Sequence, residues 1–200
     1  SAYHLFYADK HGTPGTDMTF FDWPRIGPER RGTDSISGTA FRVASQEALM
    51  FWLERFDDLA VERGEISQFA GRELLPFEDP EGQRLFLVND QGADFEGEIW
   101  PQPDIPARHA LRGFYSVVIS ASEGAEMESF FTSILGFAKV KEDHWMDGSS
   151  PGVIFSTTPD GGPGKEIWLV EQSGLPRARL GAGGVHHVAF RVRDAEQQLI

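Results

Sequence analysis

The sequence predicts an α+β protein assembled from repeats of one β-α-β-β-β unit. Two stretches, TAFRVASQEA from position 39 and VAFRVRDAEQ from position 188, share the letters AFRV followed by the start of a helix. Around them, strand-length apolar runs bounded by turn residues alternate with segments whose apolar residues have helical spacing. A pattern that recurs along a chain indicates copies of one supersecondary unit.

Size and composition are those of a soluble globular protein. Two hundred residues are enough for one or two domains, and 40% hydrophobic with 24% charged residues is ordinary. No apolar run approaches the ~20 residues of a membrane helix, and no signal peptide precedes the first strand. Cysteine is absent, which excludes disulfides, thiolate metal sites and a cysteine nucleophile. These features favour a cytoplasmic protein without a membrane partner.

The charge balance argues against nucleic acid as a partner. Lys and Arg number 18 against 31 Asp and Glu, which gives a net charge of −13. Such a surface repels phosphate backbones. The acidic residues are scattered along the chain, which is typical of a solvated surface.

Residues 1–90 are expected to form an N-terminal domain that holds a partial first unit and a complete second one. Its strands are expected at 3–9, 16–23, 37–43, 66–71, 72–79 and 84–90, with a turn at 79–82. A helix is expected over 46–64, with Ser45 as its N-cap and Gly64 near its C-terminal end. Its apolar face has the spacing i, i+3, i+4, i+7 and i+11, at Leu49, Trp52, Leu53, Phe56 and Ala60.

Residues 91–110 are expected to form an inter-domain linker, because they contain three prolines and little periodicity. Residues 111–200 then repeat the pattern as a C-terminal domain, with a third unit and the start of a truncated fourth. Strands are expected at 113–120, 138–146, 152–158, 165–172 and 185–192. Ser122 is the expected N-cap of a helix whose apolar face is Met127, Phe130, Phe131, Ile134 and Leu135.

Two adjacent histidines, His186 and His187, begin the last expected strand in GAGGVHHVAF. Neighbouring side chains on a regular strand point to opposite faces, so the two rings are not expected to share one pocket. A twist or bulge at the preceding Gly183 and Gly184 can change that. From the residues alone, a histidine hydrogen-bonded within a core stays open as the alternative to a ligand.

Several motifs together resemble the vicinal oxygen chelate superfamily, which includes glyoxalases and extradiol ring-cleaving dioxygenases. The motifs are the repeated unit, the HHVAFRV segment, and FEDPEGQRLFLV at 77–88. More specifically, YHLFYADKHGTPGTDMTFFDWP followed by GTAFRV, and later GAGGVHHVAFRV, resembles the hydroquinone-type ring-cleaving dioxygenases. The resemblance covers essentially the whole chain, and GTPGTxxTFFxWP is its specific part.

The resemblance implies paired modules that curl mixed sheets into cups, with a metal ion in one cup. Two histidines and one glutamate hold Fe(II) there, which leaves positions open for an aromatic substrate and O2. Mn, Zn and Ni are alternative metals. The implied reaction is ring cleavage of a hydroquinone or catechol-like aromatic, and the alternatives are a glyoxalase-like lyase or isomerase and a non-catalytic binding module.

Residue by residue, the resemblance assigns His187 as a metal ligand and His186 as an acid/base group, with no residues for another cofactor. The other two ligands are expected outside residues 1–200. The sequence begins directly with a strand and ends within the first turns of a helix, which is the pattern expected of a fragment. The incomplete units at the two ends are expected to leave sheet edges exposed. Because exposed edges can pair with another chain, a homodimer is a possible assembly.

The repeat predicts that the second unit carries no metal. Aligning the two AFRV segments places Gly38 where His187 stands. The resemblance places the family's glutamate four residues after the glycine of the DPxG turn, and that position is Phe86 here. In the third unit Tyr115 stands where many relatives have histidine, and a packing role is favoured for it.

The other histidines, His4, His11, His109 and His144, are expected to be structural or solvent-exposed. Phe20, Phe21, Trp23 and Trp145 are candidates to line an aromatic pocket, although a place in the core is favoured for them.

Overall fold

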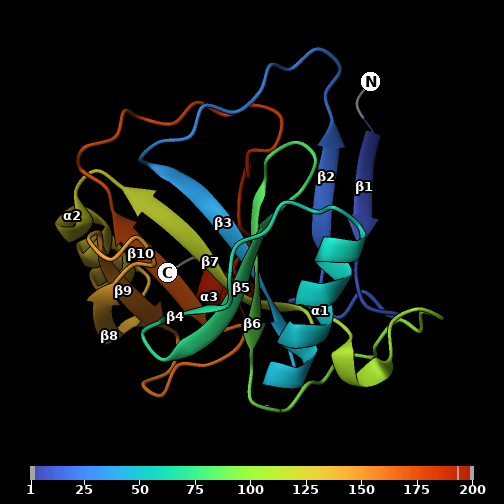
Figure 1. Cartoon of the computed structure of the whole chain (residues 1–200). Coiled ribbons are helices and arrows are strands. Elements are labelled where there is room, and N and C mark those ends of the chain that lie inside the picture. The colour runs from blue at the N-terminus through green and yellow to red at the C-terminus, as the bar shows by residue number, and fades with distance from the viewer. Residues whose placement is uncertain (1–2, 193, 199–200) are drawn as a thin grey trace.

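A computed structural model describes residues 3–192 and 194–198, and its centre is one curled eight-stranded sheet (Figure 1). The strand order is β4-β5-β6-β3-β7-β10-β9-β8. The strands are β3 (Ser35–Val43), β4 (Ser67–Phe69), β5 (Arg72–Glu78), β6 (Arg84–Asn89), β7 (Phe114–Ala121), β8 (Ala138–His144), β9 (Pro151–Ser156) and β10 (Glu166–Glu171). The predicted α+β class with mixed, cupped sheets is therefore confirmed.

The sheet consists of two similar halves. In each half the first and last strands of a unit run parallel, β3 beside β6 and β7 beside β10, and the other pairs are antiparallel. Antiparallel pairing of β3 with β7 joins the halves, with Gly38 opposite Val118. Strands predicted for the two domains thus share one sheet, while the domain boundaries at 90 and 110 stay a prediction.

A separate two-stranded hairpin, β1 (Tyr3–Tyr7) and β2 (Met18–Asp22), precedes the sheet. Its register pairs Tyr3 with Asp22 and Tyr7 with Met18, as expected for two strands joined by the turn in KHGTPG. All five β1 side chains are exposed, although most are apolar.

Helix α1 (Gln46–Asp58) covers the outer face of the first half of the sheet. The Ser45 side chain accepts a hydrogen bond from the Ala48 backbone N–H at 3.2 Å, which confirms the predicted N-cap. The predicted extension to residue 64 is wrong, because the chain turns at Ala60 with φ +52°. The Gly64 N–H then bonds the Pro76 carbonyl of β5 instead of continuing the helix.

The second helical segment is shorter than predicted and is capped differently. Helix α2 (Gly124–Ser129) passes into a π-helical turn, η2 (Phe130–Ile134). Ser122 does not cap it: its hydroxyl bonds the Asp34 carboxylate at 3.1 Å, and the Gly124 N–H bonds Glu171. Of the predicted apolar face, Phe131 is buried and Ile134 is exposed.

Two connectors, 24–34 and 176–185, lie side by side across the top of the view in Figure 1. Isolated bridges join Pro28 to Ala182 and Arg30 to Arg179. After Val185, which bridges to Ile36, the predicted strand over 185–192 does not form within the described residues. A strand needs a neighbouring strand to hydrogen-bond its backbone N–H and C=O groups. Within the described residues, no strand lies beside residues 186–192. Helix α3 (Ala195–Gln198) begins where a helix was expected.

The interior of the curl is a dense apolar cluster around Trp168, and two smaller clusters lie under α1 and α2. A short 3-10 turn, η1 (Ala107–His109), packs against α1. No helix within the described residues is long and apolar enough to cross a bilayer.

Candidate active site

His186 and His187 lie on the same side of the chain, immediately after the Val185 bridge. Their Nδ1 atoms are 2.9 Å apart, and the two rings are perpendicular. The predicted alternation to opposite faces is therefore wrong, because residues 186–192 do not form a strand. Both side chains are exposed.

The glycine-rich segment before the histidines is held by close backbone contacts. A Cβ on Gly183, whose φ is +81°, would lie 2.3 Å from the carbonyl oxygen of Glu81 in the β5–β6 turn. A Cβ on Gly181 would lie 2.4 Å from the carbonyl oxygen of Gly27 in the other connector. Glycine at these positions lets the segment pack against both neighbours, which fixes where the histidines begin.

The histidine pair lies beside aromatic residues of the hairpin. The Phe21 ring centroid is 6.0 Å from that of His186 and 6.3 Å from that of His187, and Trp23 is 5.5 Å from His186. On the other side, His4 stacks on Phe21 at 4.2 Å. The structure therefore brings together the beginning and the end of the chain around one phenylalanine.

The predicted aromatic set divides between two places. Phe21 and Trp23 remain partly exposed beside the histidines, and Phe20 contacts Tyr7 instead. Trp145 packs against the core cluster of the large sheet, as the favoured alternative predicted. His4 was not expected near the histidine pair, because its place depends on the pairing of β1 with β2 and on the path of a distant connector.

The contact between the two imidazoles restricts their chemistry. One Nδ1 must carry the shared proton and the other must accept it. When His187 is the donor, its Nε2 keeps a free lone pair, and a metal-binding histidine commonly donates its other N–H in this way. Imidazole nitrogen suits Fe, Mn, Zn or Ni, so the donor set present fits such an ion. Within the described residues, no three or more His, Asp or Glu side chains form a group that could hold a metal.

In the cup formed by the large sheet, the positions equivalent to metal ligands are filled by packing. A Cβ on Gly38 would lie 2.6 Å from Cε2 of Phe86, so the phenylalanine ring occupies the space above the glycine. Both residues face the central cluster around Trp168. That the second unit has no metal site stays a prediction, and this contact is compatible with it.

Tyr115 is a packing residue, as favoured from the sequence. It is 6% exposed and lies in the same cluster as Trp168. Burial, and then the nearby Glu166 carboxylate, raise the pKa of Tyr115 to about 12. Glu166 is itself buried and accepts hydrogen bonds from Arg72 and from the Trp168 indole.

The remaining histidines lie away from the pair. His11 is exposed and bonds Glu98 at 2.8 Å, which ties the β1–β2 turn to the 91–110 segment. His109 is buried and stacks on Phe51, and His144 is exposed at the end of β8. Their predicted structural or exposed character is confirmed.

Comparisons with known proteins give relatives in sequence and in fold, although no family model matches. The chain is 43% identical over 195 residues to a Bacillus subtilis (strain 168) protein named "Putative ring-cleaving dioxygenase MhqA", covering 98% of this chain and 61% of that protein. It is 31% identical over 199 residues to the chlorohydroquinone/hydroquinone 1,2-dioxygenase of Sphingobium indicum, covering 98% and 60%.

Among solved structures, a Bacillus subtilis protein described as a "putative dioxygenase" matches with TM-score 0.84 and 28% identity, over 99% of this chain and 60% of that one. A glyoxalase I from Zea mays matches with TM-score 0.59 and 13% identity, over 90% and 58%, which shows the fold alone. The chain thus spans about three fifths of the relatives it matches.

The chain is therefore similar in sequence to proteins named ring-cleaving dioxygenases, and its fold is that of glyoxalase I.

Proposed function

We propose that residues 1–200 form part of a metal-dependent, extradiol-type ring-cleaving dioxygenase that acts on a hydroquinone or a catechol-like aromatic. The observation that carries this proposal is the His186–His187 pair beside Phe21, in a chain similar to a hydroquinone dioxygenase. The proposed partners are the small aromatic substrate and O2.

We assign His187 as the metal ligand through Nε2, with Fe(II) as the metal and Mn, Zn or Ni as alternatives. Such an ion, when bound, brings substrate oxygen and O2 together and accepts charge from the substrate. The remaining ligands are assigned to parts of the protein outside residues 1–200, since the described residues offer no group of three.

His186 is assigned as the group that holds and moves a proton. Its Nδ1 contacts His187, so its protonation state is linked to the orientation of the ligand. Its ring also lies against Trp23 at 5.5 Å, on the exposed side of the hairpin. An imidazole nitrogen can accept a hydroxyl proton from a bound hydroquinone and later return it.

Phe21 and Trp23 are assigned as the aromatic wall of the substrate site. The two rings stack at 5.1 Å and both remain about one third exposed, so a further ring can pack on them. Stacking on an aromatic wall selects planar substrates and leaves their hydroxyl groups free for the histidine side. We place the protein in the cytoplasm and leave its assembly as a homodimer to be measured.

The test is oxygen uptake and metal content of the whole protein that carries these residues. Iron-loaded protein is expected to consume one O2 per methylhydroquinone, and removal of iron by a chelator is expected to stop the reaction. Metal binding without oxygen uptake would overturn the dioxygenase assignment and favour a glyoxalase-like lyase or isomerase. Absence of metal binding would favour a binding module.

A further inference from the structure

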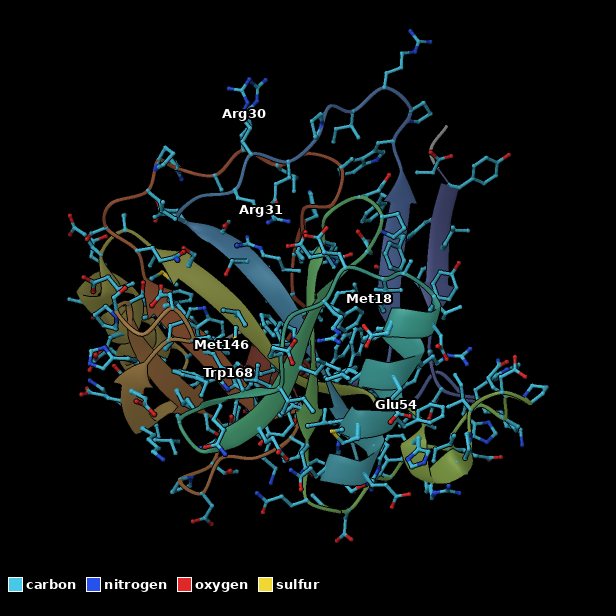
Figure 2. All side chains as sticks on the ribbon, viewed as in Figure 1. Met18, Arg30, Arg31, Glu54, Met146 and Trp168 are labelled. Atoms are coloured by element: carbon cyan, nitrogen blue, oxygen red, sulfur yellow. The ribbon has the colours of Figure 1, made fainter. Side chains whose placement is uncertain are left out.

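The cup of the large sheet contains a second pocket of about 310 Å³, apart from the histidine pair. Its apolar wall comes from Phe86 on β6, Val118 on β7 and Val170 on β10, which face the inside of the curl. Trp145 and Met146, from the loop between β8 and β9, complete the wall. Figure 2 labels Met146 near Trp168, within the curl of the sheet.

The pocket lies where the repeat places the equivalent of the metal site. Gly38 and Phe86 stand at the ligand positions, and their mutual contact excludes side chains that could bind a metal. The cup nevertheless retains an opening beside Phe86, of a volume that holds one small ring-bearing molecule.

Two of the polar side chains that line this pocket, Arg84 and Gln172, carry N–H groups that make no hydrogen bond within the described residues. Within the described part of the chain, Arg84 makes no hydrogen bond and no contact ion pair, although its guanidinium carries five N–H groups. Gln172 accepts a bond from Ser120 through Oε1 at 2.8 Å, which leaves its NH2 group free. Arg84 and Phe86 are two residues apart on β6 and therefore share a face.

Within the described residues, no carboxylate is in contact with the Arg84 guanidinium, although the partly buried Glu29 lies close enough to interact with its charge. Glu78 lies opposite Arg84 in the sheet, but its carboxylate is paired with Arg31 at 2.5 Å. Glu62 is exposed, so water and salt screen its charge. Burial and then the charge of Arg31 lower the pKa of Arg84, and the charges of Glu29 and Glu78 oppose this only in part.

The other arginine of the pocket differs in this respect. Arg63 binds Asp57 at 2.7 Å and Glu65 at 2.8 Å, so its charge is already satisfied. Arg84 is therefore the cation available to a ligand in this cup.

We propose that this pocket binds a small organic anion with an apolar ring, whose carboxylate is held by Arg84 and Gln172 and whose ring packs against Phe86 and Trp145. An arginine suits a carboxylate because its planar fork can make two parallel hydrogen bonds. The site needs no metal, so it does not depend on the function proposed for His186 and His187.

The experiment uses benzoate as the probe and NMR of the indole N–H groups in the 200-residue chain. Titration with benzoate is expected to shift the Trp145 indole signal, assigned with Trp145→Phe, with a dissociation constant of about 1 mM or below. The exposed Trp100 is the internal control and should not shift. Benzamide has the same shape without the charge, and it is expected to bind at least ~10-fold more weakly.

Two variants distinguish a charge-specific site from non-specific binding of benzoate. Arg84→Met keeps the length of the side chain and is expected to weaken benzoate binding at least ~10-fold, whereas Arg63→Met should change it by less than about twofold. Equal binding of benzoate and benzamide, or unchanged benzoate affinity in Arg84→Met, would overturn the proposal. So would the absence of any Trp145 shift up to about 10 mM benzoate.

Discussion

The Nδ1 atoms of His186 and His187 lie 2.9 Å apart, so the two neighbouring imidazoles act as one unit. One ring orients the other through a shared proton, which leaves a free Nε2 on the donor. The different roles proposed for these two adjacent residues rest on this contact.

The first prediction separates those two roles in the whole protein. His187→Ala is expected to remove iron from the purified protein and to abolish oxygen uptake, because a ligand is lost. His186→Ala is expected to retain iron but to lower kcat by about 10²- to 10⁴-fold and to flatten the pH profile, because a proton-transfer group is lost. Iron content by metal analysis and the pH dependence of kcat distinguish the variants.

His144→Ala is the control for that prediction, since this exposed histidine at the end of β8 lies apart from the pair. It should keep both iron and activity. Loss of iron in His186→Ala, with iron retained in His187→Ala, would reverse the assignment.

The second prediction concerns the backbone that carries the histidines. Gly183→Ala is expected to destabilise the 200-residue chain by about 1–3 kcal/mol, because φ is +81° and the new Cβ would meet the Glu81 carbonyl at 2.3 Å. Gly174→Ala meets no atom within 4 Å and should change stability by less than about 0.5 kcal/mol. Urea unfolding measures both values, and equal stability of the two variants would refute the explanation.

The third prediction concerns the buried ion pair of Arg72 with Glu166. The Glu166 side chain is fully buried, so Glu166→Gln is expected to cost about 3–5 kcal/mol by leaving Arg72 without its counter-charge. The pair of Arg108 with Glu47 is about two thirds exposed on both sides, and Glu47→Gln should cost less than about 1 kcal/mol. Denaturant unfolding compares the two, and a small cost for Glu166→Gln would show that water reaches the site.

The fourth prediction concerns pH. Because the pKa of Tyr115 is raised to about 12 from 10.0, the folded chain holds this proton more tightly than the unfolded chain. The resulting stability is fully present below pH 10 and is lost as pH rises toward about 12. Unfolding free energies measured from pH 9 upward should fall less steeply in Tyr115→Phe. The same slope in both proteins would contradict burial as the cause.

The sequence was sufficient to predict the strands of the large sheet, because their apolar residues alternate and turn residues bound them. Ser45 was found as a cap because its signal is local, in the residue itself and the helix that follows. The same local signal failed at Ser122, since a distant partner, Asp34, binds its hydroxyl.

The residues of the candidate site could be predicted from the sequence, but their arrangement could not, because it depends on contacts with distant parts of the chain. The histidine pair is visible in the sequence, but its geometry depends on the contacts of Gly181 and Gly183 with distant backbone. The strand expected at 185–192 needs a partner that the described residues do not provide. The place of His4 on Phe21 depends on tertiary pairing that no periodicity indicates.

The most direct test of the account is the position of iron in a crystal of the whole, iron-loaded protein, located by anomalous scattering at the iron edge. The account predicts one peak at about 2.0–2.2 Å from Nε2 of His187, a distance typical of metal–imidazole bonds, and none in the cup at Gly38 and Phe86. A peak bound elsewhere, with His187 Nε2 free, would contradict it.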